Sequence, residues 1–344
     1  MSERIKTVAL YSGWGIEPKV RNFGDELCFQ GGKKLLGAHG ISVIDIKPSI
    51  DAYTEDWTGT TVIGGGTVLP TVFENWVAPG LKTSSEIFVF GSGVLSQEEL
   101  DNKHIEGFDR IPYRRTRVIG VRGPLSAKYY LDLFGERVDF IGDLGFAFAE
   151  DESRRNIDGH IAFFIIENNL SSSRINGDYE TVLEAYLNLS KNLSSETKRL
   201  FVTDRRELPS EREPRALGEM NPVPLNSLEE FIQVIKDAKV VVTERFHPAV
   251  IAANFGIPFV YIKTTTKAHD LEQLMIAEGF GEHVDNLFVN PGDINLLGEK
   301  INALLTSQDL AHDLNAFARR VKDRLESAAV LVTRGINQDT PGSS

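Results

Sequence analysis

An arginine and a histidine stand two residues apart in the segment TERFHP, at Arg245 and His247, with Glu244 directly before them. An apolar, β-branched run at 240–242 precedes them and a small-residue helical pattern follows, which marks a strand giving way to a helix. Ligands of parallel α/β sheets bind at the carboxyl ends of strands, and helix N-termini favour anions. A fixed cation beside a titratable imidazole therefore predicts acid–base chemistry on an anionic substrate.

Other cations also follow apolar runs. Arg122 comes after the run 117–121 and before Gly123-Pro124, where a guanidinium could bind a carboxylate or phosphate. A structural ion pair is the alternative for this arginine. Lys263 and Lys267 belong to a polar turn after the run 259–262, and either could contact an anion.

Glycine-rich turns end two further runs, at 64–66 and at 91–93. None completes the G-x-G-x-x-G pattern of a dinucleotide site, which disfavours a nicotinamide enzyme. Gly65, Gly66 and Ser92 are instead candidates for close approach of the backbone to a substrate, and plain strand-to-helix turns are the alternative.

Two aspartates occupy comparable positions. Asp25 opens the helical pattern 22–38, where it could cap the helix or orient sugar hydroxyls or a catalytic base. Asp143 follows the run 138–141, and a structural hydrogen-bonding role is at least as good an interpretation for it. No H-E-x-x-H, C-x-x-C or D-x-D is present, so we predict no metal site and no cofactor.

Strand and helix patterns alternate along the whole chain, which predicts an α/β protein with mostly parallel sheets. Strands are expected at 7–11, 41–46, 60–63, 86–90, 117–121, 138–141, 160–166, 199–203, 240–242 and 259–262. Helices are expected at 22–38, 124–134, 179–193, 228–236, 293–305 and 309–328, with a surface loop at 207–224. The polar stretch 150–159 divides a domain at 1–150 from one at 160–335, and 336–344 reads as a disordered tail.

Composition limits the function further. The net charge of −12 argues against general nucleic-acid binding, because phosphate backbones need a basic surface. No apolar stretch approaches the ~20 residues of a membrane span, and no secretory signal is visible. The lone Cys28 lies in an amphipathic helical pattern and is expected in the core. We therefore expect a cytoplasmic protein.

Taken together, the motifs resemble those of the polysaccharide pyruvyl transferase family, which includes bacterial enzymes that place pyruvate ketals on exopolysaccharides. The matching pieces run in order through most of the chain: NFGDEL at 22–27, IGGG at 63–66, GSGV at 91–94, VRGPLS at 121–126, GD at 142–143, TERFH at 243–247 and FGIP at 255–258. The R-L-H of the family is Arg245-Phe246-His247 here, and Pro248 replaces the usual glycine. The resemblance implies two Rossmann-like domains facing a central cleft, similar to B-type glycosyltransferases.

The resemblance also implies an enzyme that takes phosphoenolpyruvate as donor and a pair of sugar hydroxyls as acceptor, without a cofactor. On this interpretation His247 is the general acid/base, with Asp25 as a second catalytic candidate. Arg245 and Arg122 clamp the donor anion, with Lys263 or Lys267 as a third cation. The acceptor would be a lipid-linked oligosaccharide or polysaccharide. Because such an acceptor lies at the membrane, the protein would also contact the inner face of the cell membrane peripherally.

Two other classes of function remain open on the sequence. A nucleotide-sugar-dependent glycosyltransferase of the same two-domain fold would also place arginines near a diphosphate. A non-catalytic relative could bind a glycan only, although the joint presence of Arg122, Arg245 and His247 disfavours that reading.

Overall fold

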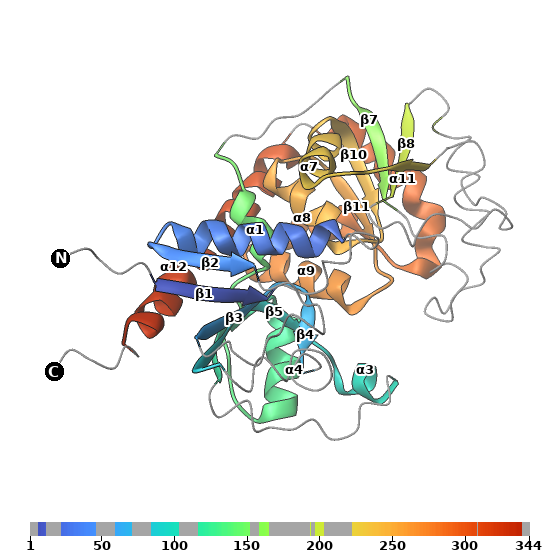
Figure 1. The fold of residues 1–344 in the computed structure, drawn as a ribbon. Coiled ribbons are helices and arrows are strands. Elements are labelled where there is room, and N and C mark those ends of the chain that lie inside the picture. Colours follow the sequence, from blue (N-terminus) through green and yellow to red (C-terminus); the bar gives the residue numbers. More distant parts are fainter. Residues whose placement is uncertain are drawn as a thin grey trace, which may run out of the picture. The chain divides into compact units, whose positions relative to one another are not determined.

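The structure is a computed structural model, and it describes residues 6–11, 22–45, 59–70, 84–102, 116–151, 158–164, 193, 197–202, 222–307 and 309–338 (Figure 1). The chain forms two compact units. Unit 1 comprises Met1–Pro18, Gly24–Ala147 and Val321–Ser344, and unit 2 comprises Lys19–Phe23 and Phe148–Arg320. None of the described helices is long and apolar enough to cross a membrane.

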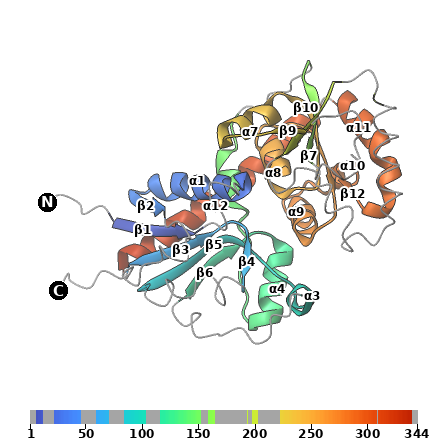
Figure 2. The same cartoon turned by 45° about the vertical axis from the view of Figure 1, so that its right-hand side comes forward.

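Unit 1 is built on a six-stranded sheet in which every described pairing is parallel. Its strands are β1 (Lys6–Tyr11), β2 (Ile41–Asp45), β3 (Thr60–Gly64), β4 (Thr67–Leu69), β5 (Glu86–Val94) and β6 (Thr116–Val121). The order is β2-β1-β3-β5, with β6 and the short β4 both paired to β5 (Figure 2). The strand order therefore reverses between β1 and β3, which is where doubly wound sheets bind ligands.

The helices of this half are α1 (Phe23–Gly37), α3 (Gln97–Asn102), α4 (Pro124–Phe134) and the 3₁₀ helix η3 (Leu144–Phe148). Helix α4 shows how its sequence sets its ends. Pro124 suits the first turn, since the amide hydrogen that proline lacks would have no partner there. Gly135 ends the helix at φ 73°, and its N–H bonds to the carbonyl of Leu131.

Unit 2 has a second six-stranded sheet, also parallel in every described pairing. Its strands are β7 (His160–Phe164), β8 (Lys198–Val202), β9 (Pro222–Pro224), β10 (Ala238–Thr243), β11 (Phe259–Ile262) and β12 (Phe288–Val289). The order β9-β8-β7-β10-β11-β12 corresponds to the doubly wound order 3-2-1-4-5-6, with its reversal between β7 and β10. Strands β7, β10 and β11 are almost entirely buried, as central parallel strands must be.

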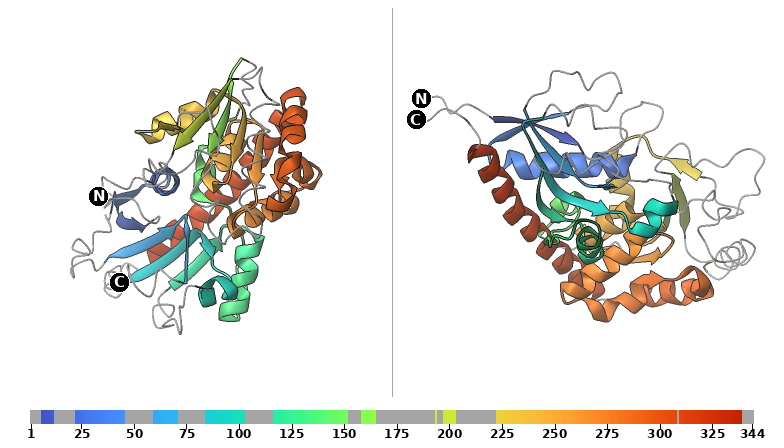
Figure 3. Two further views of the ribbon diagram at one scale, coloured as in Figure 1. Left: turned by 90° about the vertical axis from the view of Figure 1, so that its right-hand side faces the viewer. Right: turned by 90° about the horizontal axis from the view of Figure 1, so that it is seen from below.

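The remaining helices are α7 (Leu228–Lys236), α8 (Phe246–Asn254), α9 (Thr266–Ala277), η5 (Gly281–His283), α10 (Val284–Leu287), η6 (Pro291–Leu296), α11 (Leu297–Thr306) and α12 (Leu310–Gln338). Helix α12 belongs to both units, since Leu310–Arg320 falls in unit 2 and Val321–Gln338 in unit 1 (Figure 3). In unit 1 its apolar face is buried at Val321, Leu325, Ala329 and Val332.

Several expected elements differ from those observed. Helix α12 continues through 329–338, so residues 321–335 join unit 1, and 336–338, assigned to the tail, are helical. The segment 138–141 forms a single bridge, from Phe140 to Val121, in place of a strand. The polar segment after β11 is largely the start of helix α9. The expected helix at 179–193 lies outside the described residues except for Leu193, as do residues 339–344.

Candidate functional site

The segment Thr243–His247 forms the turn from β10 into α8, at the strand-order reversal of unit 2. The Thr243 hydroxyl fixes this turn, because it accepts a hydrogen bond from the Arg245 N–H at 2.7 Å and lies 2.9 Å from the Arg245 carbonyl. The Glu244 N–H donates to the Phe164 carbonyl at the end of β7, over 3.1 Å. Backbone hydrogen bonds to the neighbouring strand thus hold Arg245 and His247 at the carboxyl edge of the sheet.

Helix α8 begins at Phe246, so Arg245 is its N-cap residue and His247 lies in its first turn. Phe246 is buried, and its ring stands perpendicular to the His247 ring with centroids 5.3 Å apart. Arg245 and His247 are partly exposed, whereas Glu244 is buried. Pro248 also falls in the first turn, where a missing N–H costs no helical hydrogen bond, so the departure from the family pattern leaves the helix start intact.

The neighbouring strand β11 places the two candidate lysines at the same edge of the unit 2 sheet. Lys263 follows β11 directly, and its Nζ forms an ion pair with Glu272 Oε1 at 2.9 Å. His269 Nδ1 lies 3.4 Å from the other oxygen of the same carboxylate. Lys267 lies in the first turn of α9, whose N-cap residue is Thr265. The hydroxyl oxygens of Thr264 and Thr265 have no hydrogen-bond partner within the described part of the chain.

In unit 1 the glycine turn Gly64–Gly66 lies at the end of β3, next to the strand-order reversal. Gly65 and Gly66 have φ of 72° and 61°, a region that favours glycine. The buried Ser92 hydroxyl donates to the Gly65 carbonyl at 3.0 Å. The Gly93 N–H donates to the Gly66 carbonyl at 2.7 Å. Hydrogen bonds therefore join the turn to the end of β5 at this edge of the sheet.

Arg122 follows β6 at the same edge and is only 3% exposed. A Cβ added to Gly93 would lie 2.7 Å from the guanidinium carbon, so the guanidinium rests directly against that glycine. The backbone N–H of Arg122 donates a hydrogen bond to the Ser92 carbonyl over 2.9 Å. The predicted residues Gly65, Gly66, Ser92 and Arg122 thus come together in unit 1.

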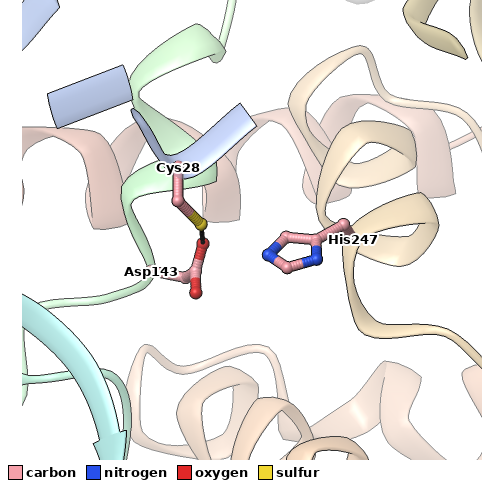
Figure 4. Close-up of side chains that lie close together, drawn as sticks. All are labelled: Cys28, Asp143 and His247. Carbon is pink, nitrogen blue, oxygen red and sulfur yellow. Dashed lines mark hydrogen bonds between the residues drawn. The ribbon is translucent and has the colours of Figure 1, made fainter. Parts of the chain in front are cut away.

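A buried pair that no sequence motif predicts, Cys28 and Asp143, lies at this edge. The Cys28 thiol donates to Asp143 Oδ1 at 3.1 Å (Figure 4). Burial raises the pKa of the Cys28 thiol well above its usual range, and the nearby carboxylates of Asp143 and then Asp25 add to the effect. The thiol is therefore a neutral hydrogen-bond donor and not a nucleophile at neutral pH.

Asp25 lies in the first turn of α1 and is 9% exposed. Its position suits the helix-cap interpretation, and it stands near enough to Cys28 to affect its titration. The sequence points to Asp143 by itself, because parallel strand ends share one edge and Gly142-Asp143 follows the last run of the first half. Nothing in the spacing of Cys28 connects it to Asp143, 115 residues away.

Solved structures define the class of fold. The Staphylococcus aureus protein MnaA, in a co-structure with UDP, is 13% identical with a TM-score of 0.53 over 90% of each chain. The glycotransferase of kitacinnamycin is 14% identical with a TM-score of 0.50, over 97% of this chain and 100% of that one. At such identities the likeness concerns the fold alone, and it confirms two Rossmann-like domains similar to B-type glycosyltransferases.

A sequence model of one family matches residues 22–265, more than two thirds of the chain. The chain belongs to the polysaccharide pyruvyl transferase family. Among curated proteins no sequence match was found. The matched range begins just before α1 and ends at Thr265, so it includes all the motifs at both sheet edges except Lys267.

Proposed function

We propose that this protein transfers pyruvate from phosphoenolpyruvate, as a ketal, onto two hydroxyls of a sugar in an exopolysaccharide repeat unit. Membership of the pyruvyl transferase family supports a transferase acting on a glycan. The observation that carries the proposal is the turn at Thr243–His247, which presents a guanidinium and an imidazole at the strand-order reversal of unit 2. A donor with a phosphate and a carboxylate suits such a place.

His247 is the proposed general acid/base. An imidazole has an unperturbed pKa of about 6.5, so it can both give and accept a proton near neutral pH. Phe246, buried beside it, limits the orientations of the imidazole ring. We propose that the ring gives a proton to the methylene carbon of the donor and takes one from an attacking hydroxyl.

The reaction balances without an oxidant or reductant. Protonation of the methylene carbon makes a methyl group and leaves the neighbouring carbon electrophilic. One sugar hydroxyl bonds to that carbon, and the bond from the carbon to the phosphate oxygen breaks. The second hydroxyl then closes the ring. The two hydroxyls lose two protons in all, one replacing the proton given to the methyl group and one leaving with phosphate.

Arg245 is the proposed anion clamp of unit 2, since its guanidinium can bind phosphate or carboxylate through two parallel hydrogen bonds. Lys263 forms an ion pair with Glu272, and either Lys263 or Lys267 is proposed as the third cation. The Thr264 and Thr265 hydroxyls, at the start of α9, supply further donors for phosphate oxygens. Glu244, buried behind the turn, is proposed to orient these groups.

The residues of unit 1 are proposed to serve the sugar acceptor and the donor anion at their own sheet edge. Gly65 and Gly66 are buried and carry no side chain that would keep a substrate from the backbone, and Ser92 fixes their conformation. Arg122 is the proposed cation there. Asp25 is the proposed partner of a sugar hydroxyl, with helix capping as the alternative. A lipid-linked acceptor would bring the protein to the inner face of the cytoplasmic membrane.

Phosphate release from phosphoenolpyruvate, measured with a panel of pyranoside acceptors, tests the proposal. Wild type should release phosphate only when an acceptor is present. His247→Ala should lower turnover by about 10²–10⁴-fold, the usual contribution of general acid–base catalysis, while donor binding persists. Arg245→Ala should weaken donor binding as well. His312→Ala and Arg137→Ala, which change exposed residues away from both edges, are the matched controls.

The same experiment separates the rival functions. Indifference to phosphoenolpyruvate, together with thermal stabilisation by a sugar nucleotide, would replace the proposal with glycosyl transfer. Binding of the glycan with neither reaction would favour the non-catalytic reading. Normal release in both His247→Ala and Arg245→Ala would remove these residues from the mechanism.

A further inference from the structure

Three segments of unit 1 meet at Asp143. They are the first half of α1, the end of β6 and the residues that lead into η3, and Cys28 of α1 also lies against the glycine turn after β3. Asp143 is fully buried, as is Cys28. A buried carboxylate is costly unless hydrogen bonds stabilise it, so its partners reveal its role.

Two hydrogen bonds reach Asp143 Oδ1. The Cys28 thiol donates over 3.1 Å, and the Gly145 N–H donates over 2.9 Å. The preceding residue, Gly142, has φ of 101° and donates its N–H to the Arg122 carbonyl at 3.1 Å. Asp143 is thus tied to α1 on one side and to the end of β6 on the other.

The sulfur of Cys28 also reaches the glycine turn. The backbone N–H of Gly66 also forms a hydrogen bond with the Cys28 sulfur. A Cβ added to Gly65 would lie 2.4 Å from Cys28 Cβ and 2.6 Å from its sulfur. The thiol is therefore enclosed between the turn and the carboxylate.

We propose that Cys28 and Asp143 act together as positioning residues, a hydrogen-bonded bridge that holds the Gly65–Gly66 turn in its substrate-binding conformation. The thiol accepts from Gly66 and donates to Asp143, so one side chain links the glycine turn to the residues that lead into η3. The contribution of the bridge to turnover rests on the proposed function. The ordering of the turn by the bridge does not depend on the proposed function.

Loss of the bridge would also affect residues outside the Gly65–Gly66 turn. The Gly66 carbonyl accepts from the Gly93 N–H, and Gly93 lies against the Arg122 guanidinium. The Gly65 carbonyl accepts from Ser92. A turn that loses its contact with Cys28 would release three of the residues assigned to substrate binding in unit 1, namely Gly65, Gly66 and Ser92.

Two substitutions of similar size separate hydrogen bonding from packing. Cys28→Ser keeps a group that both donates and accepts, whereas Cys28→Val fills similar space without either capacity. A packing role predicts that valine, which fills the buried space, is the better replacement. The bridge predicts that serine is better. The two interpretations therefore give opposite rank orders.

Amide hydrogen exchange of the whole protein is the first measurement, and it needs no substrate. In Cys28→Val we expect faster exchange in peptides that contain Gly66 and Gly145, and in Cys28→Ser exchange close to wild type. Asp143→Asn provides a second route to the same test, since it should shift the S–H stretching band of the thiol. That band is unambiguous because the chain has one cysteine.

Pyruvyl transfer is the second measurement. Cys28→Val should lower kcat/KM by about 10–100-fold, the scale of a small misplacement of binding groups, and Cys28→Ser should recover most of it. Leu36→Val, another fully buried position of α1, controls for loss of stability. It should reduce the melting temperature without reproducing the kinetic defect.

The outcomes are distinct. Slow exchange at Gly66 in Cys28→Val, or valine equalling serine in turnover, would overturn the bridge. Absence of pyruvyl transfer in wild type would overturn the proposed function instead, and the exchange rank order would still decide the bridge. Fast exchange at Gly66 in Cys28→Val but not in Cys28→Ser, together with recovery of kcat/KM in Cys28→Ser, supports both the bridge and the proposed function.

Discussion

His160 begins β7 with its side chain 6% exposed and its ring 5.4 Å from that of Phe201. Burial lowers its pKa to about 4, and the charge of Arg199 adds to the shift, while Asp237 opposes it. The folded pKa lies below the unfolded value of about 6.5, so the unfolded chain binds more protons between these two values. Stability attributable to His160 is therefore present above pH ~6.5 and is lost as the pH falls towards 4.

The first prediction concerns that loss. Between pH 7.5 and pH 5 the His160 contribution to the free energy of unfolding should fall by about 2 kcal/mol. Urea unfolding at both pH values, followed by circular dichroism, measures the total change. His160→Phe, which keeps a ring beside Phe201, should show a change smaller by that amount. Identical pH dependence in the two proteins would show that folding does not lower the pKa of His160.

Gly93 carries the second prediction, since it leaves room for the Arg122 guanidinium. A Cβ in Gly93→Ala would displace the end of a flexible side chain and leave the backbone in place. If Arg122 binds the donor, KM for phosphoenolpyruvate should rise by roughly 10-fold, a loss of about 1.4 kcal/mol in binding. Gly37→Ala is the matched control, because nothing lies within 4 Å of its added Cβ. An unchanged KM would leave Arg122 with a structural role.

At the scale of elements, Asn315 of α12 joins three segments of unit 2. Its side-chain amide donates to the carbonyls of Glu150 and Asn254, both over 2.9 Å. Asn315 is 2% exposed, so water does not readily replace these bonds. The segment after η3 and the end of α8 are thereby fixed to α12.

Removal of that amide is the third prediction. Asn315→Ala should lower the free energy of unfolding by about 2 kcal/mol, since buried carbonyls lose their donors. Asn302→Ala, an exposed asparagine of α11, should change it by less than about 0.5 kcal/mol. Denaturant titration of both variants gives the comparison. Equal stability of the two would mean that other donors satisfy the carbonyls.

The elements also show what sequence reasoning could reach. Apolar runs and glycine stops placed β3, β5, β10 and β11 within a few residues, because buried parallel strands are continuously apolar. The start of helix α9 reads as a turn in the sequence, because its first residues, TKAHD, carry no apolar face and Thr265 is its cap. The expected strand at 138–141 has a single bridge, because its chain leaves the sheet at the positive φ of Gly142.

In the candidate site, too, local sequence patterns could be interpreted and contacts between distant segments could not. Arg245 and His247 could be selected from sequence because a strand-to-helix turn sets both at a sheet edge. The ion pair of Lys263 with Glu272 and the bridge of Cys28 with Asp143 could not. Each depends on side-chain packing between elements whose spacing along the chain carries no signal.

For the whole molecule, the decisive element is α12, whose second half belongs to unit 1. The Cβ position of Gly142 would lie 2.2 Å from Val321 Cγ1, and Leu325 is fully buried nearby. The core of unit 1 is therefore completed by residues that follow all of unit 2 in the sequence.

The fourth prediction compares two leucines of this helix. Leu325→Ala should cost about 2–5 kcal/mol, the range for truncation of a buried leucine. Leu331→Ala, at a residue that is 51% exposed, should cost less than about 0.5 kcal/mol. Thermal unfolding of the two variants tests the difference. Similar melting temperatures would place α12 outside the core of unit 1.

The shared helix has a consequence for biosynthesis. Translation delivers the amino-terminal end first, and domains generally fold as units while the chain emerges. Unit 2 has all its residues once Arg320 has been made, whereas unit 1 still lacks Val321–Gln338 at that moment. Unit 1 can therefore complete its core only after α12 has been synthesised, although its synthesis begins before that of unit 2. A recombinant fragment ending at residue 150 would expose the surface that α12 covers.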